Sequence, residues 1–438
     1  MKYRLCQKYL KMQAFRFILL FLLLSAGYQL TASYILLPMN TEQTDHLKAY
    51  GVTYWTLEQG AETWWLLNYE GGSFVLPNSA SIEKECKTRG VAYRIISDAE
   101  FNNILQTIND PEINMEAIKM EKAPRIAVYT PQVNERGEEI NPWDDAVTLV
   151  LTYAEIPFDK VYDREIIEGK LTKYDWLHLH HEDFTGQYGR FYANYRGTAW
   201  YRNNQLRQEE LAKSLGFNKV SKLKLAVTDA IKEFVAGGGF MFAMCSATDS
   251  YDIAQAASHT DICSEMFDGD PQDPAAQSKL EFDNCFAFHN FTIVRDPMIY
   301  EFSNIDTDPL ARMIEPENDY FTLFDFSAKY DAIPTMLTQN HTRTVKAFMG
   351  QTTAFMRKYI KPSVLIMGEN KALGEAKYIH GEYGKGQWTF YGGHDPEDYE
   401  HRVGDPPTDL HLHPNSPGYR LILNNVLFPA AKKQKQKT

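Results

Sequence analysis

The sequence contains few cysteines, five in 438 residues. Disulfide-stapled folds use a much higher density, so buried apolar side chains must supply most of the stability. The aromatic residues, 13% of the chain, follow no fixed period, which excludes a solenoid or a propeller. A composition with 44% hydrophobic and 23% charged residues is too apolar for a disordered chain and predicts at least one large core.

The chain has fewer basic than acidic residues. The chain has 45 Lys and Arg against 57 Asp and Glu, which gives a formal net charge of −12. Because binding to a nucleic-acid backbone depends on clustered positive charge, we expect no nucleic-acid partner.

The N-terminal segment has the pattern of a secretory signal peptide. Five basic residues precede an apolar run at 17–24, and Ala32 is a small residue at a cleavage site before Ser33. A signal peptide at 1–32 predicts an exported protein, periplasmic or secreted, with no stable membrane anchor after cleavage. An uncleaved anchor over residues 17–37 is the alternative, although polar side chains interrupt that stretch.

Residues 33–122 alternate short strand patterns with helix patterns. Strands are predicted at 34–38, 63–68 and 91–96, and helices at 45–59 and 81–89. Gly60 and Gly90 follow the two helices, in the position where glycine commonly ends a helix. This order predicts a small N-terminal α/β unit.

A longer alternation covers residues 123–430 and predicts a doubly wound, mostly parallel α/β sheet, whose ligand crevice lies at the carboxyl ends of the strands. A loop-rich insertion interrupts it at about 263–361, and residues 431–438 form a basic tail. Cys263 and Cys285 flank an Asp- and Pro-rich part of the insertion, where either a disulfide or two free thiols would fit. Strands are predicted at 125–129, 158–162, 174–180, 240–244 and 363–368, a hairpin at 376–393, and helices at 143–155 (capped by Asp144 or Asp145), 220–236 and 418–427.

Cys245 stands where the buried strand 240–244 passes into a helix at 246–257. A nucleophile elbow has this layout, with small residues two positions before and after the nucleophile, here Ala243 and Ala247. The helix N-terminus would also lower the pKa of the thiol. A small buried side chain that ends a core strand is the alternative interpretation.

A second motif, His394-Asp-Pro-Glu397, follows the last strand of the hairpin. A histidine with a nearby carboxylate supplies a base and its orienting acid, provided that the loop brings both against the thiol. The two motifs together predict Cys245 as nucleophile, His394 as proton shuttle and Glu397 as orienting acid. An ordinary capping loop is the alternative for the second motif.

The elbow and the histidine loop resemble the class I glutamine-amidotransferase-like family over roughly residues 124–429. The resemblance implies a flavodoxin-like sheet and a Cys-dependent amide hydrolase that acts on a small amide. This chain departs from the family by alanines in place of the elbow glycines, by one additional residue between His394 and Glu397, and by the long insertion. The same sheet also serves in members that only bind ligands.

From Tyr34 to the basic tail, the chain is similar to exported bacterial proteins usually labelled asparagine synthetase B. The matching stretches include 174–188 and 390–398. The synthetase motifs are absent from the sequence, because Lys2 follows Met1 and no Ser-Gly-Gly-x-Asp-Ser loop occurs. The resemblance therefore implies an amidotransferase-like fold rather than an ATP-dependent synthetase.

Histidines and acids crowd the end of the predicted strand 174–180. His180, His181, Glu182 and Asp183 would line the crevice beside Cys245, and alternation places His178 on the same face as His180. Backbone N–H groups of Ser246 and around His181 are the expected oxyanion donors. The same residue types bind divalent ions, so Zn²⁺ held by His180, His181, Glu182 and His394 is an alternative. A second alternative is that these are ordinary polar residues that form hydrogen bonds and line a cleft.

Three functions follow from these residues. The first is an exported Cys-dependent amide hydrolase without a cofactor. The second is a non-catalytic domain that binds a glycan, a peptide or a protein through the aromatic insertion and the polar crevice. The third is a metal-dependent hydrolase that uses the histidine cluster.

Overall fold

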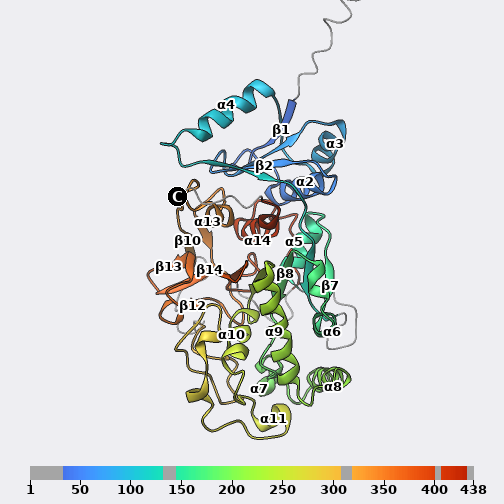
Figure 1. Ribbon diagram of the computed structural model, residues 1–438, viewed down its shortest axis with the longest axis vertical. Coiled ribbons are helices and arrows are strands. Elements are labelled where there is room, and N and C mark those ends of the chain that lie inside the picture. The colour runs from blue at the N-terminus through green and yellow to red at the C-terminus, as the bar shows by residue number, and fades with distance from the viewer. Residues whose placement is uncertain (1–32, 132–144, 307–317, 400–405, 432–438) are drawn as a thin grey trace, which may run out of the picture.

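A computed structural model describes residues 33–131, 145–306, 318–399 and 406–431. The predicted signal peptide and residues 432–438 of the basic tail lie outside these ranges. The molecule is elongated, with the N-terminal unit at one end and a larger mixed α/β part below it (Figure 1). Within the described ranges, no helix has both the length and the apolar character that crossing a membrane requires.

The N-terminal unit is a five-stranded antiparallel sheet in the order β4-β1-β3-β2-β5. The predicted strands and helices are present, and the structure adds a strand β3, a helix α4 and a strand β5 that the sequence analysis did not predict. Ser97 begins α4 through a capping box with Glu100. The elements are β1 (Ser33–Leu37), α2 (His46–Glu58), β2 (Thr63–Leu67), β3 (Ser73–Pro77), α3 (Ala80–Arg89), β4 (Arg94–Ser97), α4 (Asp98–Asn109) and β5 (Glu116–Met120).

A ten-stranded mixed sheet organises the larger part, in the order β11-β10-β13-β14-β15-β9-β8-β6-β7, with β12 paired to β14. The five strands from β15 to β7 are parallel, whereas the strands from β11 to β15 pair antiparallel. The α/β class is confirmed, and the sheet is mixed. Its strands are β6 (Ile126–Tyr129), β7 (Asp159–Val161), β8 (Trp176–His180), β9 (Phe240–Met244), β10 (Tyr320–Leu323), β11 (Thr344–Lys346), β12 (Phe355–Met356), β13 (Leu365–Asn370), β14 (Glu375–Tyr383) and β15 (Gly386–Tyr391).

Helices cover both faces of this sheet. On β9, Phe242 joins the core cluster that contains α5 and α14, whereas its neighbour Met241 joins the cluster that contains α9 and α10. This split follows from the period of two in a strand, which points successive side chains to opposite faces. The helices are α5 (Ala146–Tyr153), α6 (Asp163–Ile167), α7 (Tyr192–Tyr195), α8 (Ala199–Ser214), α9 (Val220–Gly237), α10 (Ala247–Ala256), α11 (Glu265–Asp268), α13 (Ala332–Leu337) and α14 (Pro417–Leu427).

The described parts of the segment 263–361 contain long loops, and they also supply the strands β10, β11 and β12 to the large sheet. Cys263 and Cys285 are free thiols that donate to the carbonyl oxygens of Thr185 and Asp252, at 3.3 and 3.2 Å. Of the two alternatives left open by the sequence, the structure has the free thiols.

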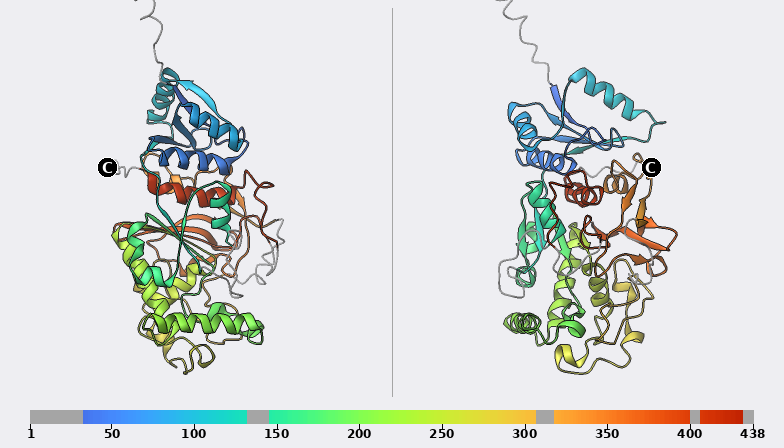
Figure 2. Two further views of the ribbon diagram at one scale, coloured as in Figure 1. Left: turned by 90° about the vertical axis from the view of Figure 1, so that its right-hand side faces the viewer. Right: turned by 180° about the vertical axis from the view of Figure 1, so that it is seen from behind.

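The N-terminal unit packs on α14 through α2, and the views in Figure 2 show the two helices stacked at the junction. Arg420 on α14 is fully buried there and donates to the backbone oxygens of Met39 (2.9 Å) and Gly71. One core cluster contains both Leu47 of α2 and Leu421 of α14. The two sheets therefore share a continuous core.

Candidate functional site

The carboxyl ends of three parallel strands place the predicted site residues beside one another. His180 at the end of β8 and Tyr391 at the end of β15 both pair with Met244 on the central strand β9. Cys245 follows Met244, so it lies between the chain that continues into His181 and the chain that continues into His394. The topological rule for strand ends thus brings these residues to one edge of the sheet.

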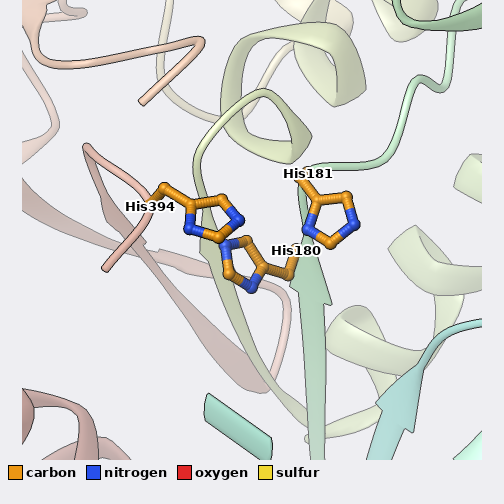
Figure 3. Close-up of side chains that lie close together, drawn as sticks. All are labelled: His180, His181 and His394. Atoms are coloured by element: carbon orange, nitrogen blue, oxygen red, sulfur yellow. The ribbon is translucent and has the colours of Figure 1, made fainter. Parts of the chain in front are cut away.

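Three imidazoles converge at this edge (Figure 3). The ring centre of His180 lies 4.4 Å from that of His394 and 4.7 Å from that of His181. One potential ligand atom from each of the three histidines lies within 4.8 Å of the others. His180 is buried, His394 is half-buried and His181 is exposed, so the cluster is anchored in the core and open to solvent on one side.

The buried carboxylate of Asp145 lies against the buried side of the histidine cluster. Asp145 is the N-cap of α5 and accepts the backbone N–H groups of Val147 and Thr148 at 2.7 and 2.8 Å. Its Oδ2 atom lies 2.8 Å from Nδ1 of His180 and 3.2 Å from Nε2 of His178. Burial alone would raise the pKa of Asp145, but His180 and His178 hold it well below its usual range.

The ring nitrogens of His180 bear on whether the cluster can bind a metal ion. Both ring nitrogens are buried and neither has a hydrogen-bond partner among the described residues, although Nδ1 lies 2.8 Å from Oδ2 of Asp145. Metal-binding histidines commonly direct one nitrogen to a carboxylate and the other to the ion, and the proximity of Nδ1 to Asp145 fits the first half of this pattern. Three imidazoles with one open side form the ligand set of a catalytic zinc site, whose fourth position holds water.

The other predicted crevice residues have structural partners. The carboxylate of Glu182 lies 3.8 Å from Nζ of the buried Lys224. Asp183 accepts Thr185 Oγ1 at 2.6 Å and the backbone N–H of Gly189 at 2.9 Å, which closes the loop after β8. In the described residues, the cluster of ligand atoms therefore consists of His180, His181 and His394 without the predicted Glu182.

Cys245 has the backbone of an elbow. Its φ angle is 53°, in the left-handed region that non-glycine residues adopt at strained turns. The side chain is 1% exposed. Burial raises the pKa of the thiol to about 11, although N–H groups of Thr352, Ser246 and Gln351 face the sulfur and oppose this shift. The thiol is covered in this structure.

The predicted orienting acid, Glu397, lies against two other side chains. Its Oε2 atom accepts the Tyr399 hydroxyl at 2.6 Å and lies 3.2 Å from Nδ1 of His413. The neighbouring Asp395 is buried and accepts the Tyr419 hydroxyl at 2.7 Å. Both acids shape the loop that carries His394, whose backbone N–H donates to Met349.

Sequence reasoning missed two contributors to this site. Asp145 was predicted only as a helix cap, and the Asp-capped helix pattern at 143–155 gives no sign that it reaches His180. The N–H groups of Gln351 and Thr352 come from the insertion, about a hundred residues after Cys245 in the chain. Their sequence carries no pattern that predicts contact with the thiol.

Comparisons with known proteins define no family for this chain. No family model matches the sequence, and no curated protein matches it. Two cytoplasmic proteins from Salmonella typhimurium align with 70% of this chain and all of their own, at 10% and 12% identity, with TM-scores of 0.33 and 0.36. A GH42 β-galactosidase aligns with 62% of this chain and 28% of its own, at 12% identity and a TM-score of 0.27.

Proposed function

We propose that this chain is a metal-dependent hydrolase whose divalent ion, Zn²⁺ by its ligand set, is held by His180, His181 and His394. The observation that carries the proposal is the convergence of three imidazoles within 4.8 Å at the ends of β8 and β15. The placement of Asp145 behind His180 supports it, because this is the usual support of a ligating histidine. A bound ion would supply a water of lowered pKa as nucleophile.

The three histidines differ in burial, and we assign their roles from this difference. His180 is fixed between the sheet and Asp145, so it sets the position of the centre. The exposed His181 and the half-buried His394 leave the opposite side accessible to substrate. For the fold, we propose the flavodoxin-like arrangement of class I glutamine amidotransferases, supported by the five parallel strands and the elbow at Cys245. For the compartment, we propose export through cleavage after residue 32.

The metal content of the purified protein tests this function directly. We expect one Zn²⁺ per chain by inductively coupled plasma mass spectrometry, loss of the ion on dialysis against a chelator, and recovery when Zn²⁺ is restored. Hydrolysis of a simple ester such as 4-nitrophenyl acetate should follow the metal content through the same cycle. A protein that binds no divalent ion at micromolar concentration would contradict the proposal.

Replacing Asp145 with asparagine should weaken Zn²⁺ binding by about 10–100-fold, the usual effect of a lost supporting carboxylate. Asparagine is as good an N-cap as aspartate, so α5 keeps its acceptor for Val147 and Thr148. Isothermal titration of the metal-free protein measures the change. Asp98→Asn in the first turn of α4 is the matched control and should leave the Zn²⁺ affinity unchanged. An equal loss of Zn²⁺ affinity in both variants would show that Asp145 does not support the metal site.

A thiol-dependent amide hydrolase built on Cys245 is a second candidate function. The strained φ of Cys245 at a strand-to-helix turn favours it, as do the backbone N–H groups that face the sulfur. These donors would suit an oxyanion or a thiolate. The metal centre is better supported because the thiol is covered and its pKa is raised.

The rate at which Cys245 reacts with iodoacetamide separates the two candidates. With a thiol pKa of about 11, labelling should be slow between pH 5 and 8 and rise about tenfold for each pH unit, because only the thiolate reacts. Mass spectrometry of the labelled peptide measures it, and the urea-unfolded protein, with an ordinary thiol pKa, is the control. Rapid labelling at pH 6 that is lost in His394→Ala would favour the thiol enzyme.

A further inference from the structure

A cavity lies away from the histidine cluster, where the N-terminal unit meets the antiparallel side of the large sheet. Its volume is about 450 Å³, within the range of about 300–1,000 Å³ that is typical of small-ligand sites. One wall is formed by the β2–β3 turn at Asn68 and by Asn114 before β5. The other wall is formed by residues 323–326 at and just after the end of β10, by Thr335 of α13 and by residues between 338 and 343 that follow α13.

The two walls are tied together by amide groups, so the cavity is preformed. Gln339 Nε2 donates to Oδ1 of Asn68 at 2.9 Å, and Gln339 Oε1 accepts the backbone N–H of Asn68 at 2.9 Å. Asn114 Nδ2 donates to the backbone oxygen of Phe326 at 3.1 Å. A ligand that enters this cavity would lose little affinity to ordering of the protein.

The lining chemistry restricts the ligand class. The charged side chains among the lining residues are Asp325 and Arg343, and these form an ion pair with each other. Amide and hydroxyl side chains make up much of the remaining surface, including Asn340 and Thr342. Phe324 presents an aromatic side chain that is 41% exposed. This combination suits a neutral ligand with many hydroxyl groups and an apolar face.

We propose that this cavity binds a neutral oligosaccharide, with one sugar face on the Phe324 ring and its hydroxyl groups toward the amide and hydroxyl side chains. A ring without hydrogen-bonding atoms covers the apolar C–H face of a sugar. Asn68, Asn114 and Asn340 each use one side-chain N–H within the protein, so their second N–H is the donor available to a sugar hydroxyl. Asp325 and Arg343 neutralise each other, so the lining has no net charge that would attract a charged ligand. The site is separate from the histidine cluster in residues and position.

Saturation-transfer NMR and isothermal titration with maltotriose, cellotriose, xylotriose and chitotriose test the proposal on the purified protein. We expect binding of at least one of them, weakened about tenfold in Phe324→Ala and retained in Phe324→Trp. Tyr330→Ala removes another aromatic side chain, 68% exposed and outside the lining, and should leave binding unchanged. His394→Ala should also bind normally, which keeps this test independent of the metal proposal.

Three results would overturn the oligosaccharide site. They are the absence of binding to all four sugars at millimolar concentration, equal binding by wild type and Phe324→Ala, and binding of charged oligogalacturonate or of peptides in place of the neutral sugars. Thermal unfolding of each variant, compared with the wild type, confirms that a loss of binding is local.

Discussion

His394→Ala should weaken Zn²⁺ binding by more than about 100-fold, because even a supporting partner of a ligand is worth about 10–100-fold. The ring of His394 comes from the loop after β15 and meets His180 of β8 at a centroid distance of 4.4 Å. Its removal leaves two imidazoles, one of them exposed, and two ligands hold zinc weakly in water. Titration of metal-free protein with Zn²⁺ measures the affinity.

The variants for this test are chosen by exposure. His181 is exposed and His394 is half-buried, so alanine at either position removes a ligand without opening the core. His259→Ala removes a histidine that is 74% exposed, and it should bind Zn²⁺ as the wild type does. Zn²⁺ should also raise the unfolding temperature of the wild type and of His259→Ala, but not of the two ligand variants, since only the folded state holds the ion. Equal Zn²⁺ affinities in the wild type and the three variants would contradict the proposed metal centre.

The meeting of the three histidines was predictable from the sequence. Strand patterns ended at His180, at Met244 and near Tyr391, and parallel strands bring their carboxyl ends to one edge of a sheet. The strand boundaries and the α/β class hold in the structure. The place of His394 depends in addition on the parallel pairing of β15 with β9, which the hairpin pattern does not specify. Successive side chains of a β-strand point to opposite faces of the sheet. His180 therefore lies on the face covered by α5, whereas its neighbour Leu179 packs toward α10.

The sequence could not predict which acid supports the cluster. Glu397 and Glu182 are close to the histidines along the chain, yet Tyr399 and Lys224 lie against them in the structure. Asp145 lies about 35 residues before His180, and only the packing of α5 on the sheet brings it within 2.8 Å of Nδ1. Such a contact depends on tertiary structure and leaves no local pattern.

The N-terminal unit shows a second kind of limit. Within its antiparallel sheet, β2 and β3 form a hairpin, and the hairpin depends on a turn in which Asn68, Glu70, Gly71 and Gly72 all have positive φ. The two glycines are a turn signal, but β3 is short and ends at Pro77. Without β3, the alternation of helices and strands predicts an α/β unit and leaves the direction of pairing open.

Lys224→Met should lower the free energy of unfolding by about 3–5 kcal/mol, the usual effect of removing one partner from a buried ion pair. Lys224 and Asp163 each have side chains that are 1% exposed, and Nζ lies 3.1 Å from Oδ2. Nζ also donates to the Tyr129 hydroxyl at 2.8 Å. Methionine fills the space of the lysine stem but leaves the Asp163 charge without its cation. Urea unfolding of the two proteins measures the difference.

The double variant Lys224→Met with Asp163→Asn separates the charge from the packing. If the loss comes from the uncompensated carboxylate, the neutral asparagine should recover most of it, because a buried pair is often replaceable by neutral groups at little net cost. Lys222→Met, on the exposed side of the same helix, should stay within about 0.5 kcal/mol of the wild type. A loss under about 1 kcal/mol in Lys224→Met would mean that water or a shifted side chain already compensates Asp163. Because Nζ also lies 3.8 Å from the carboxylate of Glu182, directly after His181, the same substitution removes a charge partner beside the histidine cluster.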